Sequence, residues 1–335
     1  MNFYNNSQIL ITGGTGSFGN EFCRKIVKNK IKPKRLIIFS RDEFKQSEME
    51  KKYPVKKFPF IRFFIGDIRD KERLYRAMEN IETVIHAAAL KHVNLGEYNP
   101  MEVIKTNVIG AQNIVDACLD KNVKNVIALS TDKASSPINL YGASKLCSDK
   151  IFLSANNIKG VRKTKFSVVR YGNVLGSRGS VVPIFINLNK IDNKFTLTHS
   201  EMTRFNISLD EGVEFVNWCH KNNIGGEIFV PKLKSFKVTD LAKAINKNAE
   251  FINIGLRPGE KIHEELISES DIPNTLEGKN HFVILNYHSK INIQNYKKKN
   301  KLSELKTKTK YSSDLNKSFL SINDLRQILR VHKFI

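Results

Sequence analysis

The stretch QILITGGTGSFG, residues 8–19, joins a largely apolar run to a glycine-rich loop. Its first half is typical of a buried strand, and its glycines follow a G-x-x-G-x-x-G pattern. Glycine lets the backbone approach an anion closely, and a helix beginning here offers free N–H groups to a phosphate. A strand, loop and helix in this order predict a dinucleotide-binding unit, although tight turns alone also use glycine. The expected contacts are Gly13, Thr15, Gly16, Ser17, Phe18 and Gly19.

Similar apolar runs recur along the first half of the chain and alternate with amphipathic segments such as 101–121. This alternation predicts a doubly wound, parallel α/β sheet. Ligands bind such sheets at the carboxyl ends of the strands, so the residues after each run are candidates for chemistry. The predicted strands are 8–12, 35–40, 62–66, 83–87, 125–130 and 166–170.

The length of the chain allows more than one lobe. It has 335 residues, 41% hydrophobic and 26% charged, a balance typical of a globular protein with a sizeable core. The alternation weakens after residue 173. We therefore expect a Rossmann domain over 1–172 and mainly a smaller α/β substrate-binding lobe over 173–335, with some segments returning to the first domain. Ser321 is expected to cap a terminal helix.

Composition excludes several classes of protein. The formal net charge of +22 raises nucleic acid as a partner, but the basic residues are spread along the chain, which favours solvated lysines. The 4 cysteines form no C-x-x-C pair, so neither zinc nor a disulfide framework is indicated. With no long apolar run or signal peptide, we expect a cytoplasmic protein that binds no membrane, metal or nucleic acid.

The end of the second predicted strand bears on the choice of dinucleotide. An acidic residue there would favour the ribose 2′-hydroxyl of NAD. The chain instead has Ser40 and Arg41, with Lys45 nearby, and a hydroxyl with cations suits the 2′-phosphate of NADP. The alternative is a surface ion-pair cluster of these cations with Asp42 and Glu43.

Residues after the third and fourth predicted strands extend the cofactor site. The carboxylate of Asp67 can accept from the adenine amino group, and small residues leave room for the cofactor to pass. His86 and His92 flank apolar residues and are expected to be structural. The contacts predicted here are Asp67, Ile68, Ala87, Ala88 and Lys91.

The stretch LSTDKASSPINLYGASK, residues 129–145, contains the candidates for catalysis. Tyr141 and Lys145 share one face of a predicted helix. A cation beside a phenol is expected to lower the pKa of Tyr141 and make it a base toward a hydroxyl group. Lys145 can also hold the nicotinamide ribose. Asp132 and Lys133 lie just upstream; the alternatives for them are a loop cap and a lysine that holds a phosphate or carbonyl.

These features together resemble the extended short-chain dehydrogenase/reductase superfamily. Longer stretches resemble one branch more closely, the inverting UDP-N-acetylglucosamine 4,6-dehydratases that open pseudaminic acid biosynthesis. They are FSRDEFKQSEME (39–50), ALSTDKASSPINLYGASKLCSDK (128–150), MTRF (202–205) and LRPGEKIHEELIS (256–268). The likeness covers nearly the whole chain, although Asn206 stands where relatives commonly carry an aromatic residue.

The resemblance implies a lyase with an internal NADP redox cycle. Tyr141 would deprotonate the sugar 4-hydroxyl, positioned by Thr131, as hydride leaves C4. Lys133 would take the C5 proton and Asp132 would protonate the departing 6-hydroxyl. Hydride then returns to C6, and C5 is reprotonated from the opposite face. In retaining sugar-nucleotide dehydratases, the pair that corresponds to Asp132 and Lys133 resembles Asp-Glu. Lysine at position 133 therefore favours the inverting branch.

To act as a base, Lys133 must be neutral for part of the time. We expect burial and the neighbouring cations Lys91 and Lys145 to lower its pKa. Substrate contacts are expected from cations and amides that suit a diphosphate or a sugar, although each arginine alone is equally consistent with a surface ion pair. The predicted substrate contacts are Lys91, Asn173, Arg204, Arg257 and Glu260.

Two other functions stay open. An NDP-sugar 4-epimerase conserves mass, but it does not explain an acid and an amine at 132 and 133. A non-catalytic NADP-sensing or nucleic-acid-associated protein would suit the charge, but it gives no role to the Tyr–Lys pair. In relatives, helices equivalent to 101–121 and 141–156 form a dimer, and the dimers often assemble into hexamers, so the resemblance implies a homo-oligomer.

Overall fold

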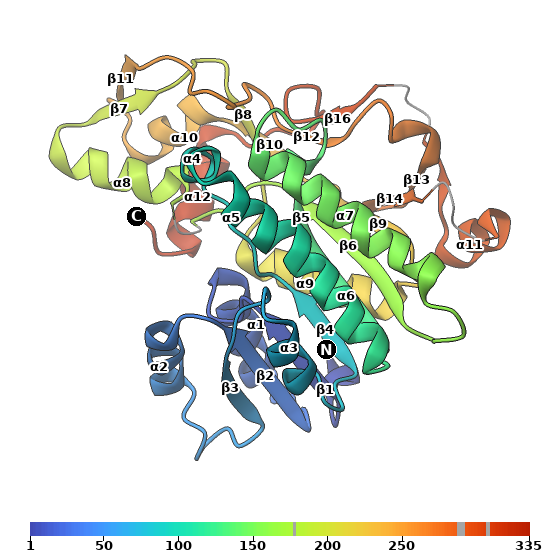
Figure 1. Ribbon diagram of the computed structural model, residues 1–335. Helices are drawn as coiled ribbons and strands as arrows, with labels where there is room; N and C mark the ends of the chain where they lie inside the picture. The colour runs from blue at the N-terminus through green and yellow to red at the C-terminus, as the bar shows by residue number, and fades with distance from the viewer. Residues whose placement is uncertain (177–178, 287–291, 306–308) are drawn as a thin grey trace.

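The computed structural model describes residues 1–335 except 177–178, 287–291 and 306–308 (Figure 1). The strands of its largest sheet are β1 (Gln8–Thr12), β2 (Arg35–Ser40), β3 (Ile61–Ile65), β4 (Thr83–His86), β5 (Asn125–Thr131), β6 (Lys165–Tyr171), β9 (Glu227–Pro231), β13 (Thr275–Glu277), β14 (His281–Leu285) and β15 (Ser303–Glu304). The 10 strands are ordered β15-β13-β14-β9-β6-β5-β4-β1-β2-β3. From β3 to β6 all neighbours are parallel, which confirms the doubly wound α/β fold.

Helices cover both faces of this sheet. They are α1 (Ser17–Lys28), α2 (Glu43–Lys52), α3 (Lys71–Ala77), α4 (Val93–Tyr98), α5 (Pro100–Ile104), α6 (Gly110–Asp120), α7 (Leu140–Ile158) and α9 (Leu209–Asn222). The helices α3, α6 and α7 pack together in one layer, and α1 packs against α9 in the other (Figure 1). Side chains alternate between the faces of a strand, so Leu10 joins the core of the first layer, whereas Ile9 and Ile11 join the core that contains Phe22 of α1.

The amphipathic segment 101–121 is helical, as predicted, but it is interrupted. A π-helical stretch, Lys105–Ile109, separates α5 from α6. Within it, the Asn107 side chain donates to the Leu90 carbonyl and accepts from the Leu90 N–H, each at 2.9 Å. It also donates to the Ser144 hydroxyl of α7 at 3.0 Å. The wider turn therefore ties the loop after β4 to α7.

A second lobe has its own apolar core. It contains α8 (Val181–Ile191), β7 (Lys194–Leu197), β8 (Thr203–Asn206), β10 (Lys234–Lys237), α10 (Val238–Ile245), β11 (Glu250–Asn253) and α12 (Ile322–Val331). Ser321 caps α12 in a reciprocal box with Asp324, as predicted. A short antiparallel pair, β12 (Glu265–Ile267) and β16 (Tyr311–Ser312), and the helix α11 (Ile293–Asn300) complete the chain. Residues 173–335 also supply α9, β9, β13, β14 and β15 to the main sheet and its layers.

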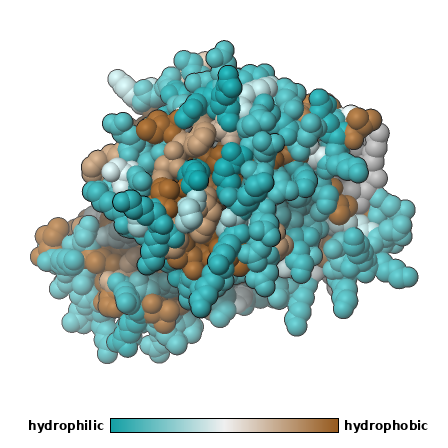
Figure 2. Space-filling model, turned by 90° about the horizontal axis from the view of Figure 1, so that it is seen from below, coloured by the Kyte–Doolittle hydropathy of each residue, from teal (hydrophilic) through white to brown (hydrophobic). Residues whose placement is uncertain are grey.

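The face of the molecule seen from below is largely polar. Hydrophilic side chains cover much of the face in Figure 2, and apolar groups interrupt them in patches. Within the described ranges, no helix has the length and hydropathy that a bilayer crossing requires.

Packing of α1 on the glycine loop predicts that Gly19 cannot be enlarged. A Cβ at Gly19 would lie 2.0 Å from the Gly14 carbonyl oxygen, a backbone atom that cannot move aside freely. We expect Gly19→Ala to lower the free energy of unfolding by about 3 kcal/mol, measured by urea denaturation. Gly212→Ala is the control, because a Cβ there meets its nearest atom, in the Ile207 side chain, only at 4.0 Å. It should stabilise α9 by about 0.5–1 kcal/mol. Equal effects of both changes would contradict this account.

Candidate active site

A cavity of about 620 Å³ opens where the parallel strands end. Its position, between the carboxyl ends of β1, β2, β4 and β5, is where doubly wound sheets bind ligands. Most residues singled out from the sequence line it: Gly13, Thr15, Gly16, Ser17, Phe18, Ser40, Arg41, Lys45, Asp67, Ile68, Ala87, Ala88, Lys91, Thr131, Asp132, Lys133, Tyr141, Lys145 and Asn173. Gly19, Arg204, Arg257 and Glu260 lie outside this lining, as far as the described residues show.

The glycine loop brings backbone to the cavity wall. Gly13 has a φ of +63°, and a Cβ there would lie 2.9 Å from Ala88 Cα, so the loop touches the segment after β4. Gly16 is the N-cap of α1, and no side chain of the described residues caps this helix end. The first N–H groups of α1 are therefore available to an anion, which fits the pyrophosphate of a dinucleotide.

The cavity rim beyond β2 contains the cations proposed for the 2′-phosphate of NADP, and it also contains an ion pair of the kind that the alternative expects. Arg41 is half-exposed, and its guanidinium lies 3.7 Å from the Asp67 carboxylate. Lys45 does pair with Asp42, as the ion-pair alternative expects. The Ser40 hydroxyl is buried and accepts from Thr15 at 3.2 Å.

Asp67 is engaged by a neighbour on its own loop. Its carboxylate accepts from the Arg69 backbone N–H at 3.0 Å and lies 2.8 Å from the Arg69 guanidinium. Burial raises the pKa of Asp67, but Arg69 and Arg41 outweigh burial and hold it below its usual value. Asp67 is therefore a stable carboxylate acceptor at the cavity wall.

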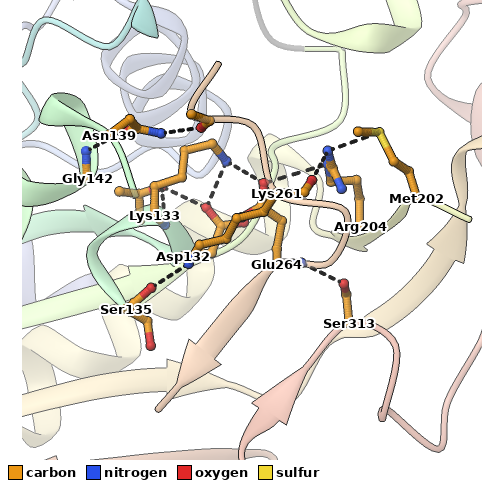
Figure 3. Close-up of polar contacts among 12 residues, drawn as sticks. Asp132, Lys133, Ser135, Asn139, Gly142, Met202, Arg204, Lys261, Glu264 and Ser313 are labelled. Carbon is orange, nitrogen blue, oxygen red and sulfur yellow. Dashed lines mark hydrogen bonds and ion pairs between the residues drawn. The ribbon is translucent and has the colours of Figure 1, made fainter. Parts of the chain in front are cut away.

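The candidate catalytic residues meet where β5 ends against the start of α7. The ammonium of Lys133 lies 3.1 Å from Asp132 Oδ1 and 2.9 Å from Glu264 Oε1 (Figure 3). The Thr131 hydroxyl donates to Asp132 Oδ1 at 2.8 Å. Thus the structure adds a carboxylate, Glu264, that sequence reasoning did not single out.

The prediction that the pKa of Lys133 is lowered is wrong, because two carboxylates surround its ammonium. Burial lowers the pKa, but Asp132 and Glu264 outweigh burial, and the net shift is upward. Of the cations nearby, Arg204 opposes this rise. Two carboxylates within hydrogen-bond distance stabilise the ammonium more than burial destabilises it.

The pKa of Tyr141 also moves against expectation. Burial raises it to about 12, and the Lys133 charge and the Thr131 hydroxyl only partly oppose the rise. The ammonium of Lys145 instead donates to the Leu129 carbonyl at 2.8 Å. Burial lowers the pKa of Lys145, although Asp149 opposes this change.

Several buried oxygens of the site lack a hydrogen-bond partner among the described residues: Asp132 Oδ2, Asn173 Oδ1 and Glu264 Oε2. Asp132 and Asn173 line the cavity, so a polar ligand there can satisfy them. Burial, followed by the charge of Glu264, raises the pKa of Asp132. A carboxyl group of this kind holds a proton more readily than an exposed one and suits a general acid.

The predicted substrate arginines have different surroundings. Arg204 is largely buried, and its guanidinium donates to the carbonyls of Thr203, Lys261 and Ile262 at 2.7, 3.0 and 2.8 Å. It also lies 3.7 Å from Glu264 (Figure 3). Arg257 and Glu260 lie together in a turn, in which the Arg257 N–H donates to the Glu260 carboxylate at 3.3 Å. Contact of Arg204, Arg257 and Glu260 with substrate stays a prediction.

His86 is structural in the fold, as expected. Its ring is buried, lies 2.8 Å from the Thr12 hydroxyl through Nδ1, and packs on Phe152. The Thr12 oxygen accepts from Ala87 N–H at 3.2 Å and from Ala88 N–H at 3.3 Å. This contact joins the ends of β1 and β4 beneath the glycine loop.

Comparisons with known proteins agree with this geometry. Residues 9–286 match the family described as polysaccharide biosynthesis protein. The chain is 50% identical to the UDP-N-acetylglucosamine 4,6-dehydratase (inverting) of Campylobacter jejuni subsp. jejuni, over 97% of this chain and 98% of that protein. It is 42% identical to the UDP-glucose 4-epimerase of Rickettsia felis, over 79% and 78%. The X-ray structure of Pen from Bacillus thuringiensis superposes with a TM-score of 0.90 at 35% identity, covering 99% of this chain and 100% of that chain.

The buried His86 predicts an acid-sensitive fold. Burial, followed by the charge of Lys145, lowers its pKa from 6.5 to about 3. Between these values the unfolded chain binds the proton and the folded chain does not, so stability falls as the pH falls. We expect His86→Gln to remove about 1.4 kcal/mol per pH unit from the slope of unfolding free energy between pH 6 and about 4. His92→Gln, at an exposed histidine, is the control, and equal slopes in all three proteins would contradict the prediction.

Proposed function

The chain belongs to the polysaccharide biosynthesis protein family and, within it, to the inverting UDP-N-acetylglucosamine 4,6-dehydratases; we propose that its substrate is UDP-N-acetylglucosamine and that C5 is inverted. The observation that carries this proposal is the Asp132–Lys133 pair beside Tyr141 in one cavity. Oxidation and reduction at C4 need only the Tyr–Lys pair. Elimination of water also needs a base near C5 and an acid near C6.

Each residue has a separate part in the proposed reaction. Tyr141 takes the proton of the 4-hydroxyl, which Thr131 positions. The resulting C4 ketone acidifies C5, and Lys133 removes its proton while Asp132 protonates the leaving 6-hydroxyl. The unpartnered Asp132 Oδ2 and the raised pKa of this carboxyl support its role as the acid. The product would be UDP-2-acetamido-2,6-dideoxy-β-L-arabino-hex-4-ulose.

The cofactor that we propose is NADP, which when bound would accept hydride from C4 and return it to C6. The glycine loop would hold its pyrophosphate, and Lys145 its nicotinamide ribose. Arg41 supports NADP over NAD, because its half-exposed guanidinium lies at the rim beside the buried Ser40 hydroxyl. A planar guanidinium binds a phosphate through paired hydrogen bonds.

We propose the same assembly and setting as the family resemblance implies. The chain would form a homo-oligomer, with a dimer as its unit and hexamers as the larger assembly. Tyr98, Met101 and Ile109 are 86%, 56% and 51% exposed beside the α6–α7 layer, which supports a contact between copies there. The product would enter pseudaminic acid biosynthesis in the cytoplasm and serve flagellin or surface glycans.

The direct test is incubation of the purified protein with UDP-N-acetylglucosamine and NADP in deuterated water, followed by mass spectrometry and proton NMR. We expect a 4-keto product that has lost one water, carries deuterium at C5 and has the inverted configuration. Lys133→Met should lower kcat at least about 100-fold, because the base is lost. Lys150→Met, at an exposed lysine of α7, is the matched control. Unchanged mass with altered configuration at C4 would instead establish an epimerase.

The choice of cofactor is tested at Arg41. We expect Arg41→Ala to weaken NADP binding about 10- to 100-fold and to leave NAD binding unchanged, because one charge-assisted contact to the 2′-phosphate is lost. Lys45→Ala should have a smaller effect, because Lys45 already pairs with Asp42. Calorimetric titration with both dinucleotides measures these affinities. Equal losses for NAD and NADP would contradict NADP selection by Arg41.

A further inference from the structure

We propose that Glu264 is a positioning residue, whose carboxylate orients Lys133 and stabilises the ammonium that forms as Lys133 takes the C5 proton. This inference rests on the proposed function and adds a residue to it. Glu264 lies immediately before β12, and its Oε1 is 2.9 Å from the Lys133 ammonium (Figure 3). Lys133 lines the cavity and Glu264 does not, within the part of the chain that the structure describes. Glu264 therefore contacts the Lys133 ammonium without lining the cavity itself.

The backbone of Glu264 is held in place by Ser313. Its N–H donates to the Ser313 hydroxyl at 2.9 Å, and its carbonyl accepts from the Ser313 N–H at 2.8 Å. The same hydroxyl lies 2.6 Å from Thr203 on β8. These bonds fix the backbone from which the carboxylate reaches the Lys133 ammonium, and a carboxylate on a fixed backbone can orient the ammonium that it binds.

The charges that face Lys133 come from several elements. Asp132 and Glu264 are the carboxylates, Arg204 and Lys261 are the nearby cations, and Tyr141 is the phenol. Burial raises the pKa of Glu264, but Lys133 and Arg204 outweigh burial and lower it. Glu264 is therefore a carboxylate when Lys133 carries its positive charge.

The role of Glu264 follows from the proton transfers in the elimination step. Before elimination, Asp132 holds a proton and Lys133 is neutral. Lys133 takes the C5 proton, the C5–H electron pair forms the C5–C6 double bond, and the C6–O bond breaks. The oxygen leaves as water with the Asp132 proton. The ammonium now lies between two carboxylates, which is the charged arrangement that the structure contains at 3.1 and 2.9 Å.

Glu264 therefore interacts more strongly with the transition state than with the reactant. A neutral amine attracts a carboxylate weakly, whereas the developing ammonium attracts it strongly. C5 then takes a proton from solvent on its opposite face, and Tyr141 releases its proton to solvent. Return of the proton from Lys133 to Asp132, across the 3.1 Å contact, restores the starting pair. The raised pKa of Lys133 is then a property of the form that follows proton abstraction.

Glu264→Gln tests the proposal, because it keeps the shape and removes the charge. We expect kcat to fall about 100-fold with little change in KM. The limb of the kcat profile that rises with pH should move to lower pH, because an amine without this carboxylate loses its proton more easily. With substrate deuterated at C5, the isotope effect on kcat should increase. The absorbance of reduced nicotinamide should build up, because C4 oxidation proceeds and C5 abstraction is slow.

Glu264→Asp keeps the charge and should recover part of the lost rate. The matched control is Glu265→Gln, because Glu265 is also buried but accepts from Ser135 at 3.2 Å and from Ser136 at 2.6 Å. It should keep the wild-type isotope effect and pH profile. Wild-type values of kcat and isotope effect in Glu264→Gln would overturn the role of Glu264 alone. Absence of dehydrated product from the wild-type protein would overturn the proposed function and this role with it.

Discussion

Parallel pairing of β1 with both β2 and β4 is the constraint on which the site depends. Thr12 pairs with Phe39 on one side and with His86 on the other, so these strands end at the same edge. Their loops must leave from that edge in opposite directions, which opens the crevice between them. The glycine loop enters the crevice because Gly13 has no side chain to strike Ala88. The candidate residues of the glycine loop and those that follow β2 and β4 owe their positions to this arrangement.

The requirement to balance a buried charge joins the end of β5 to a distant segment of the chain. The side chain of Lys133 is partly buried, and an unpaired ammonium is unfavourable in such a place. Its partner Glu264 lies 131 residues further along the chain. Arg204, on β8, lies 3.7 Å from Glu264 and donates to the carbonyls of Lys261 and Ile262. The ion pair thus ties the segment before β12 to the end of β5 at the cavity.

Local pattern was enough for β1 to β6 and for most of the cavity wall, but it did not predict β9, β13, β14 and β15 of the same sheet. The strand bounds agree within a residue, because apolar runs and glycine loops depend on near neighbours in the chain. Glu264 belongs to the quoted stretch LRPGEKIHEELIS, but nothing local indicated that it would reach Lys133. The pKa shifts of Lys133 and Tyr141 were wrong in direction for the same reason. They depend on burial and on which charges the tertiary structure brings together.

Ser313, which holds Glu264 through its backbone, has a consequence for how the protein is made. A nascent chain can complete β1 to β6, the glycine loop and the Tyr–Lys pair long before residue 313 has been synthesised. The backbone of Glu264 gains its hydrogen bonds to Ser313 when β16 docks beside β12. The fold would therefore acquire its capacity to bind a dinucleotide before its capacity for elimination.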